Sequence, residues 1–336
     1  MPISKQYNYS LLGHNTMGID VKAQQFITYD TVDELKEVLQ EIAGRPILHI
    51  GRGSNLLFTR DFEGVVLHSS IKFTQIVMRN QREVVVRVGA GVVWDDFCAQ
   101  MAQNNFYGSE NLSHIPGEVG AAAVQNIGAY GVEVESIIQE VETIEIATGK
   151  PRVFHVSECE YGYRESIFKN QLRGQYVVTA VVFKLSVTPV VHLDYGQLQD
   201  LKALPHTPSA QDIRDAVIAI RRSKLPEPDQ LGSAGSFFKN PVVPIELFND
   251  IAATHHEVPH YAIDEKQVKI PAAWLIEQCG WKGKCHGGAA VYEKQPLIIV
   301  NKNHATSSDI MELASLIQQS VYDTFKINIY PEANYI

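Results

Sequence analysis

Hydrophobic and polar positions follow helical and strand spacings in turn along the first third of the chain. A capping-box pattern at Thr31 and Glu34 precedes apolar residues that recur on one helical face, and Gly44 closes this segment. The helix leads directly into a strand-like apolar run at 46–50. A β-branched run at 83–88 then predicts another strand, and apolar positions between 94 and 101 predict the helix after it.

The pattern changes after Ile137, where strand-like segments dominate at 141–146 and 175–183. Beyond them, a helix at 209–222, capped by Ser209 and flanked by prolines, is typical of a boundary between domains. The C-terminal part predicts, in chain order, a helix at 272–279, a strand at 296–300, a helix at 308–325 and a strand-like tail at 327–336. Together these elements indicate an α+β fold.

Composition narrows the class of protein. The 336 residues carry 29 basic and 38 acidic side chains, a net charge of −9, and no long basic run, which argues against a nucleic-acid partner. The 4 cysteines show no ligand spacing, so we expect no metal site and a reducing compartment. Because no apolar stretch approaches membrane-spanning length, we expect a cytoplasmic protein without a membrane partner.

Two glycines and a Ser-Asn pair directly follow the strand at 46–50, in the sequence Gly51-Arg-Gly-Ser-Asn55. A dinucleotide fingerprint needs a third glycine at the position of Leu56 and a helix after it, but 55–58 looks extended. A Walker loop would need a Gly-Lys-Ser/Thr sequence, which does not follow. Clustered backbone N–H groups still suit a diphosphate, and a simple tight turn is the alternative.

A second glycine-rich segment runs from His114 to Gly131 and also contains several alanines. Such small residues let the backbone pass close to something flat or bulky. The alternative is tight internal packing of a helix or turn. Two separate segments of this kind suggest a long ligand with a diphosphate and a planar ring.

A series of motifs in this order resembles the UDP-N-acetylenolpyruvoylglucosamine reductases, flavoenzymes of peptidoglycan precursor synthesis. The resemblance rests on the two glycine segments together with His14-Asn-Thr-Met-Gly-Ile-Asp20, Tyr161-Gly-Tyr-Arg-Glu-Ser166, Ala234-Gly-Ser-Phe-Phe-Lys-Asn-Pro241 and Pro331-Glu332. It implies an FAD-binding fold of the vanillyl-alcohol-oxidase type, with two α+β subdomains, and a C-terminal α+β substrate-binding domain. The implied boundaries are 1–75 and 76–222 for the subdomains, the second joined by the tail 327–336, and 223–326 for the substrate-binding domain.

The resemblance implies that NADPH reduces FAD, which then reduces the enolpyruvyl ether of UDP-N-acetylglucosamine enolpyruvate to UDP-N-acetylmuramate. A hydride is added to the β-carbon, and Ser236 matches the residue that gives a proton to the α-carbon. Arg164 matches the arginine that stabilises the charge developing on the substrate carboxylate, a task that suits a permanently charged planar fork. Glu332 matches the family's C-terminal glutamate, which acts beside that arginine.

Further residues match binding positions of the family. The FAD-binding matches are Gly51, Arg52, Gly53, Ser54, Asn55, Ile115, Pro116, Gly117, Asn126, Gly128, Ala129 and Tyr130. The substrate-binding matches are Tyr195, Lys224, Asn240, Tyr261 and Gln295. The insertion at 251–269 places the chain in a longer subgroup, in which the Tyr261 loop closes over the uridine end. Asn334 departs from several relatives with a basic residue there, which weakens any charge contact from the tail to the flavin.

Two other functions compete with this interpretation. One is an FAD-dependent oxidase or dehydrogenase of another sugar or alcohol, although Ser236 and Glu332 serve a protonation that such a reaction does not need. The other is a silent nucleotide-binding homologue, which would be expected to have lost Arg164, Ser236 or Glu332. For the active enzyme we expect a monomer.

Overall fold

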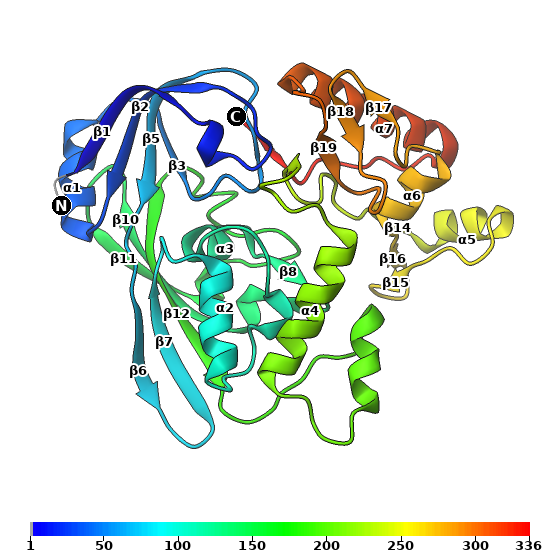
Figure 1. The fold of residues 1–336 in the computed structure, drawn as a ribbon, viewed down its shortest axis with the longest axis horizontal. Helices are drawn as coiled ribbons and strands as arrows, with labels where there is room; N and C mark the ends of the chain where they lie inside the picture. Colours follow the sequence, from blue (N-terminus) through cyan, green and yellow to red (C-terminus); the bar gives the residue numbers. More distant parts are fainter. Residues whose placement is uncertain (1–2) are drawn as a thin grey trace. The chain divides into compact units, whose positions relative to one another are not determined.

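The contacts of the chain divide it into two units in the computed structural model, which describes residues 3–336 (Figure 1). Unit 1 comprises the N-terminal residues through Tyr9, then 22–52 and 62–223. Unit 2 comprises 10–21, 53–61 and 224–336. The chain therefore passes from unit 1 to unit 2 between Arg52 and Gly53, inside the first glycine segment.

The first sheet of unit 1 has the strand order β1-β2-β5-β3, with parallel pairing of β2 to β5 and of β5 to β3. Helix α1 connects β2 to β3, as parallel strands require a crossover. The Thr31 hydroxyl accepts a hydrogen bond from the Glu34 backbone, so the expected capping box is confirmed. The bounds are β1 Ser4–Ser10, β2 Lys22–Tyr29, α1 Val32–Glu41, β3 Ile47–Ile50 and β5 Phe62–Ser69.

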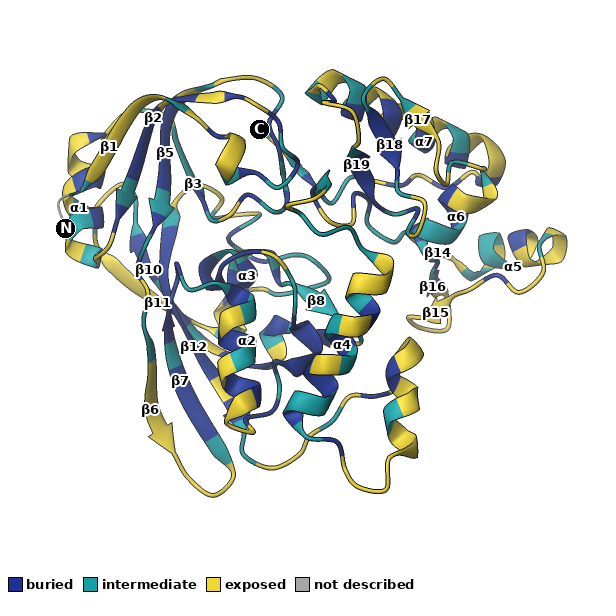
Figure 2. Ribbon diagram, in the orientation of Figure 1, coloured by how far each residue is buried: buried dark blue, intermediate teal, exposed yellow. Residues whose placement is uncertain are grey.

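The second sheet of unit 1 is antiparallel, in the order β11-β10-β12-β7-β6. Apolar side chains of α2 and α3 pack with one face of β7 and β12 in a shared core. Figure 2 shows β7 and β12 almost continuously buried. The bounds are β6 Thr74–Arg79, β7 Glu83–Gly89, α2 Trp94–Gln103, α3 Val119–Gln125, β10 Ile138–Glu145, β11 Pro151–His155 and β12 Tyr176–Ser186.

A hairpin and a last helix complete unit 1. The hairpin consists of β8 (Gly128–Ala129) and β9 (Val132–Glu133). Helix α4 (Ala210–Lys224) buries Ile213 and Val217 in a separate small core. The Ser209 hydroxyl accepts a 3.1 Å hydrogen bond from the Asp212 backbone, which confirms the expected cap.

Unit 2 has a four-stranded sheet in the order β13-β19-β18-β17, against which helix α7 packs. A three-stranded sheet, β14-β16-β15, carries helix α5, and a parallel pair joins β20 to β4. The bounds are β4 Leu56–Leu57, β13 Gly232–Ser233, β14 Val242–Pro244, α5 Ile245–Thr254, β15 Tyr261–Ala262, β16 Gln267–Lys269, α6 Ala272–Gln278, β17 Cys285–His286, β18 Ala289–Val291, β19 Ile299–Asn301, α7 Ser307–Phe325 and β20 Asn334–Tyr335.

The elements expected from the spacing of apolar residues are present, with two corrections. The strand expected at 296–300 is wrong at its start, because Gln295 to Ile298 forms a turn and β19 begins at Ile299. In the strand-like tail at 327–336, the structure has one regular strand, β20. Ile327 and Ile329 are buried in alternation with exposed neighbours, but the Ile329 carbonyl accepts from a Gln318 side chain instead of a strand. Between Ile329 and β20, the tail pairs with the rest of unit 2 through one isolated bridge, between Pro331 and Phe238.

Candidate active site

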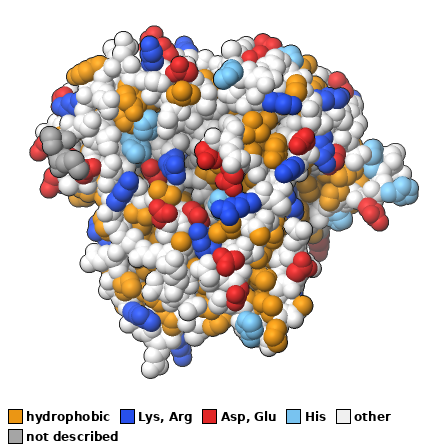
Figure 3. Space-filling view, in the orientation of Figure 1, with side chains coloured by type: hydrophobic (Ala, Val, Ile, Leu, Met, Phe, Trp, Pro, Cys, Tyr) orange, Lys and Arg blue, Asp and Glu red, His pale blue; other side chains and the backbone are white. Residues whose placement is uncertain are grey.

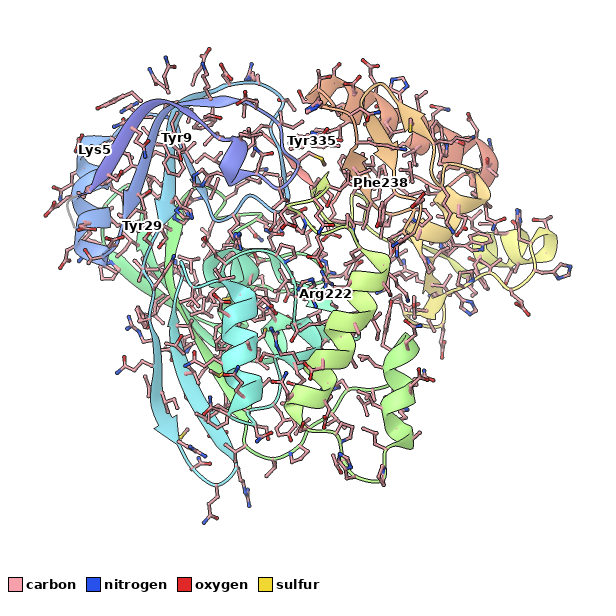
Figure 4. The ribbon with its side chains drawn as sticks, viewed as in Figure 1. Lys5, Tyr9, Tyr29, Arg222, Phe238 and Tyr335 are labelled. Carbon is pink, nitrogen blue, oxygen red and sulfur yellow. The ribbon has the colours of Figure 1, made fainter. Side chains whose placement is uncertain are left out.

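The C-terminal tail lies along the segment that carries Ser236. The backbone N–H of Glu332 donates a 2.8 Å hydrogen bond to the carbonyl of Phe237, the residue after Ser236. Phe238 forms a bridge with Pro331, and the ring of Phe237 lies 6.2 Å from that of Tyr335. Figure 4 labels Phe238 and Tyr335 in unit 2. The structure therefore brings together two of the expected catalytic residues, Ser236 and Glu332.

The side chain of Ser236 is exposed and available for chemistry. It follows Gly235 between β13 and β14, where the neighbouring Phe237 and Phe238 are fully buried. These two rings fix the backbone on one side of the serine. Within residues 3–336, the Ser236 hydroxyl makes no hydrogen bond. It is therefore free to exchange a proton with a bound molecule.

The first glycine segment also joins this part of unit 2. Asn55, which is buried, donates from its side-chain amide to the carbonyl of Glu332 at 3.2 Å. The Asn334 backbone donates to the carbonyl of Asn55 at 2.9 Å, which continues into the pairing of β20 with β4. The Asn334 amide lies 3.4 Å from the same carbonyl. Asn334 therefore holds the tail against the loop by neutral hydrogen bonds.

Gly53 packs against the motif His14-Asn-Thr-Met, whose role could not be inferred from the sequence. Gly53 has a positive φ of 65°, and a Cβ atom there would overlap the backbone of His14 and Asn15. Asn301 donates to the carbonyl of Met17 at 3.1 Å, and β13 lies against the same carbonyl at Gly232. The motif is thus a support for the two loops of unit 2 that carry expected site residues.

Arg164 lies in unit 1, in a turn closed by backbone bonds between Gly162 and Glu165. Its φ of 59° is unusual for a residue with a side chain, and such strain is concentrated at functional sites. The guanidinium donates to the carbonyl of Gly128 at 2.6 Å and lies 4.0 Å from the carboxylate of Glu133. A Cβ atom at Gly128 would lie 2.6 Å from the same guanidinium, so a larger residue there would require the guanidinium to shift.

Asn126 ties this turn to the second glycine segment. It ends α3 in the left-handed conformation and is completely buried. Its amide donates to the Glu133 carboxylate at 2.8 Å and to the Gly162 carbonyl at 2.9 Å, and its oxygen accepts from Glu135. The protein itself therefore uses the polar atoms of Asn126, which gives this residue a structural role.

Tyr130 and Tyr195 lie together in unit 1. Their rings are 6.0 Å apart and nearly perpendicular, and Tyr195 is 42% exposed. Burial raises the pKa of the Tyr130 hydroxyl, while a hydrogen bond with Arg221 acts in the opposite direction. An expected cofactor residue and an expected substrate residue thus meet at one place, and Arg221 was not identified from the sequence.

The other expected substrate residues lie in unit 2. Asn240 accepts a 2.9 Å hydrogen bond from the backbone of Ala272, so it fixes the start of α6. Tyr261 on β15 is 44% exposed, with the Lys269 ammonium 6.0 Å from its ring centre. Gln295 accepts from Leu297 in the turn before β19. Lys224 is exposed at the end of α4. These four residues therefore lie on separate elements, and Lys224 is the first residue of unit 2 after the end of unit 1 at Ser223.

The two segments expected to hold FAD are rich in small residues and partly exposed, as a bound cofactor requires. Gly51 and Gly53 carry no side chains in the first loop, where Arg52 is exposed and Ser54 is half-buried, and Pro116 is exposed in the second segment. Small residues let a ligand approach the backbone, and clustered backbone N–H groups suit phosphate oxygens. The residues present therefore fit a diphosphate-containing cofactor.

The structure was searched for features of nucleic-acid, membrane and metal binding. On the face in Figure 3, Lys and Arg side chains are interspersed with Asp and Glu and form no basic stripe. None of the helices in residues 3–336 has both the length and the apolar character to cross a membrane. Across the same range, His, Cys, Asp and Glu form no cluster of metal-binding size.

Comparison with known proteins covers the whole chain. Residues 227–336 match the family described as UDP-N-acetylenolpyruvoylglucosamine reductase, C-terminal domain, and residues 23–155 match the FAD binding domain. A UDP-N-acetylenolpyruvoylglucosamine reductase of Bacteroides fragilis is 50% identical, covering 98% of this chain and 100% of the relative. One of Neisseria gonorrhoeae is 40% identical, covering 98% and 97%.

A solved structure supports the fold. The crystal structure of the UDP-N-acetylenolpyruvylglucosamine reductase from Thermus caldophilus matches with a TM-score of 0.69 at 22% identity, covering 100% of this chain and 99% of that one. The expected fold class, an FAD-binding fold of the vanillyl-alcohol-oxidase type with a C-terminal α+β domain, is confirmed.

Proposed function

The chain belongs to the family of UDP-N-acetylenolpyruvoylglucosamine reductases, and from this premise we propose which of its residues perform the reaction. The protein is an FAD-dependent oxidoreductase of peptidoglycan precursor synthesis. Its substrate in our proposal is UDP-N-acetylglucosamine enolpyruvate, its product UDP-N-acetylmuramate, and its reductant NADPH.

FAD supplies the hydride when it is bound. We assign its diphosphate to the loop Gly51, Arg52, Gly53, Ser54 and Asn55, and the rest of the cofactor to Ile115, Pro116, Gly117, Asn126, Gly128, Ala129 and Tyr130. The support is the small, partly exposed character of both segments. Asn126 contributes by fixing the backbone around Gly128, because its own polar atoms are engaged within the protein.

Ser236 gives the proton to the α-carbon of the substrate. Its hydroxyl is exposed and makes no hydrogen bond within residues 3–336. A serine is a weak acid, but a carbon beside a developing carboxylate charge is a strong base, so the position of the hydroxyl matters more than its acidity. The buried rings of Phe237 and Phe238 supply that position.

Arg164 and Glu332 act on the substrate carboxylate. A guanidinium held by Gly128 provides fixed positive charge where negative charge develops, which lowers the barrier without reorganisation. Glu332 is placed by backbone bonds on both sides, from its N–H to Phe237 and from Asn55 to its carbonyl. This double anchoring beside the Ser236 segment is the observation that carries the proposal.

Tyr195, Lys224, Asn240, Tyr261 and Gln295 complete the proposal as substrate contacts. Lys224, a compact and exposed cation, suits the substrate diphosphate. The half-exposed Tyr261 suits a loop that covers the uridine end. The proposal also includes the domain boundaries. The FAD-binding subdomains are 1–75 and 76–222, the second joined by the tail 327–336, and the substrate-binding domain is 223–326. We further propose a cytoplasmic location and a monomer.

An anaerobic titration tests the function. The purified protein should be yellow, NADPH should bleach the flavin absorbance, and UDP-N-acetylglucosamine enolpyruvate should restore it. The product should then contain one hydride and one proton more than the substrate. A flavin that is reduced by NADPH but never reoxidised by this substrate would favour the silent homologue, and reoxidation only by another sugar would favour the alternative dehydrogenase.

A further inference from the structure

A buried carboxylate lies where the two glycine segments meet in unit 1. Glu118 follows Gly117 directly, and its side chain is 7% exposed. One of its oxygens lies 3.1 Å from Nε2 of His68 on β5, whose side chain is 16% exposed. The other oxygen lies so near Gly51 that a Cβ atom there would be 3.0 Å away. Glu118 is therefore adjacent to both segments that we assign to FAD.

The groups that face this pair from neighbouring elements are uncharged near neutral pH. On β3, burial and then the charge of His68 lower the pKa of His49 to about 3. On β2, burial raises the pKa of Tyr29, which hydrogen-bonds His49 at 2.7 Å and is labelled in Figure 4. The ring of Phe26, also on β2, stacks 6.1 Å from His68.

Compensation of the Glu118 charge falls to His68. Of the residues that the structure describes, His68 is the ion-pair partner of Glu118, and Arg52, which follows Gly51, is exposed. A carboxylate removed from water is costly unless it is paired. With a neutral imidazole the pair carries one negative charge, and with a protonated imidazole it carries none.

We propose that His68 and Glu118 form a positioning pair for FAD, in which protonated His68 neutralises a carboxylate that would otherwise repel the cofactor's diphosphate. The inference rests on the proposed function, because it takes Gly51 and Gly117 as part of the diphosphate cradle. At separations of several ångströms in a partly buried setting, one uncompensated charge changes affinity on the order of tenfold or more. Binding of the dianion favours the protonated pair, so FAD binding takes up a proton and strengthens as the pH falls.

The alternative role for the pair is purely structural, a hydrogen bond that holds β5 to the start of α3, and it predicts other effects on FAD affinity. If the hydrogen bond only held these elements together, removal of either partner would weaken FAD binding in the same direction. Charge compensation instead predicts opposite effects for the two partners. The sign of the change therefore separates the two roles.

The test is FAD affinity of the apoprotein, prepared from the full chain and measured by quenching of flavin fluorescence between pH 6 and pH 8. His68→Gln keeps a donor but leaves the carboxylate charged, and it should weaken FAD binding by about tenfold or more. Glu118→Gln should bind FAD at least as tightly as the parent and lose the pH dependence. The double variant should resemble Glu118→Gln. Glu142→Gln, which breaks the ion pair with Arg87 on the second sheet, is the matched control and should leave affinity unchanged.

Weaker binding by Glu118→Gln, or equal affinity of all variants, overturns the proposal. Melting of each apoprotein shows whether a variant folds, and if His68→Gln does not, the sign for Glu118→Gln alone decides. A parent protein that binds no FAD would reject the cofactor assignment itself, which is a different result from a parent that binds FAD with affinity indifferent to the pair.

Discussion

The side-chain amide of Asn55 donates a 3.2 Å hydrogen bond to the backbone carbonyl of Glu332, which lies 277 positions away in the chain. A residue expected to hold FAD thus fixes the backbone of a residue expected to act on the substrate. Asn55 is buried, and the bond itself is part-buried. Within unit 2, the backbone of Glu332 is therefore held by Asn55.

Asn55→Ala should release the tail. The Glu332 carbonyl loses a part-buried hydrogen bond from Asn55, and a bond of this kind contributes about 0.5–1.5 kcal/mol to stability. Urea unfolding should show this loss, and the rate of flavin reoxidation by substrate should fall as well. Asn104→Ala removes an exposed amide-to-carbonyl bond and is the control. A fall in stability without any change in reoxidation would separate the tail from catalysis.

Ser236→Ala should slow one half-reaction, the reoxidation of the flavin by substrate, and leave the other, its reduction by NADPH, nearly unchanged. Loss of a positioned proton donor should slow reoxidation by the enolpyruvyl substrate on the order of 10²–10⁴-fold, while reduction by NADPH stays near normal. Stopped-flow absorbance of the flavin measures both steps. Ser315→Ala, on the exposed surface of α7, should change neither. Equal loss in both half-reactions would mean that Ser236 only shapes its loop.

Gly128→Ala should displace Arg164. The new methyl group would lie 2.6 Å from the guanidinium and 2.9 Å from the Glu133 side chain, so one of them must move. Overpacking of this kind costs about 1–3 kcal/mol, and the reoxidation step should slow with it. Gly13→Ala is the control, because nothing lies within 4 Å of its added Cβ. An unchanged reoxidation rate in Gly128→Ala would show that catalysis does not depend on the present position of the Arg164 guanidinium.

Acid should destabilise the protein through His49. Its pKa is lowered from 6.5 to about 3 by burial, so between these values the unfolded chain binds a proton that the folded chain does not. Stability is therefore present above pH 6.5 and is lost as the pH falls, by up to about 1.4 kcal/mol per pH unit. Urea unfolding at several pH values measures the slope.

His49→Gln supplies the comparison for that slope, since it keeps a polar partner for Tyr29 without a titrating group. The variant should lose stability less steeply between pH 6.5 and pH 4 than the parent does. His155→Gln, at a side chain that is 65% exposed, should retain the parental slope. Identical slopes in all three proteins would show that His49 does not govern the acid sensitivity.

The sequence by itself determined the family and located helices α1, α2, α4, α6 and α7 and the strands β3, β7, β10 and β12, whereas most of the other strands were not predicted. Amphipathic spacing located α1, α4 and α7, with caps recognised for α1 and α4, because helix formation depends on neighbours three and four residues apart. Strand β1 escaped detection, because its residues are mostly exposed and show no apolar alternation. The motifs identified the chemistry, since each is a short run of residue types that keeps its order along the chain.

Only the tertiary structure decided how those motifs act on one another. Asn55 and Glu332, Gly128 and Arg164, and Glu118 and His68 are pairs whose members lie far apart in the sequence. The physical reason is that a hydrogen bond, an ion pair or a forbidden methyl group depends on distances of about 3 Å. Periodicity and composition carry no information about those distances. They arise only when sheets and loops bring separate segments of the chain together.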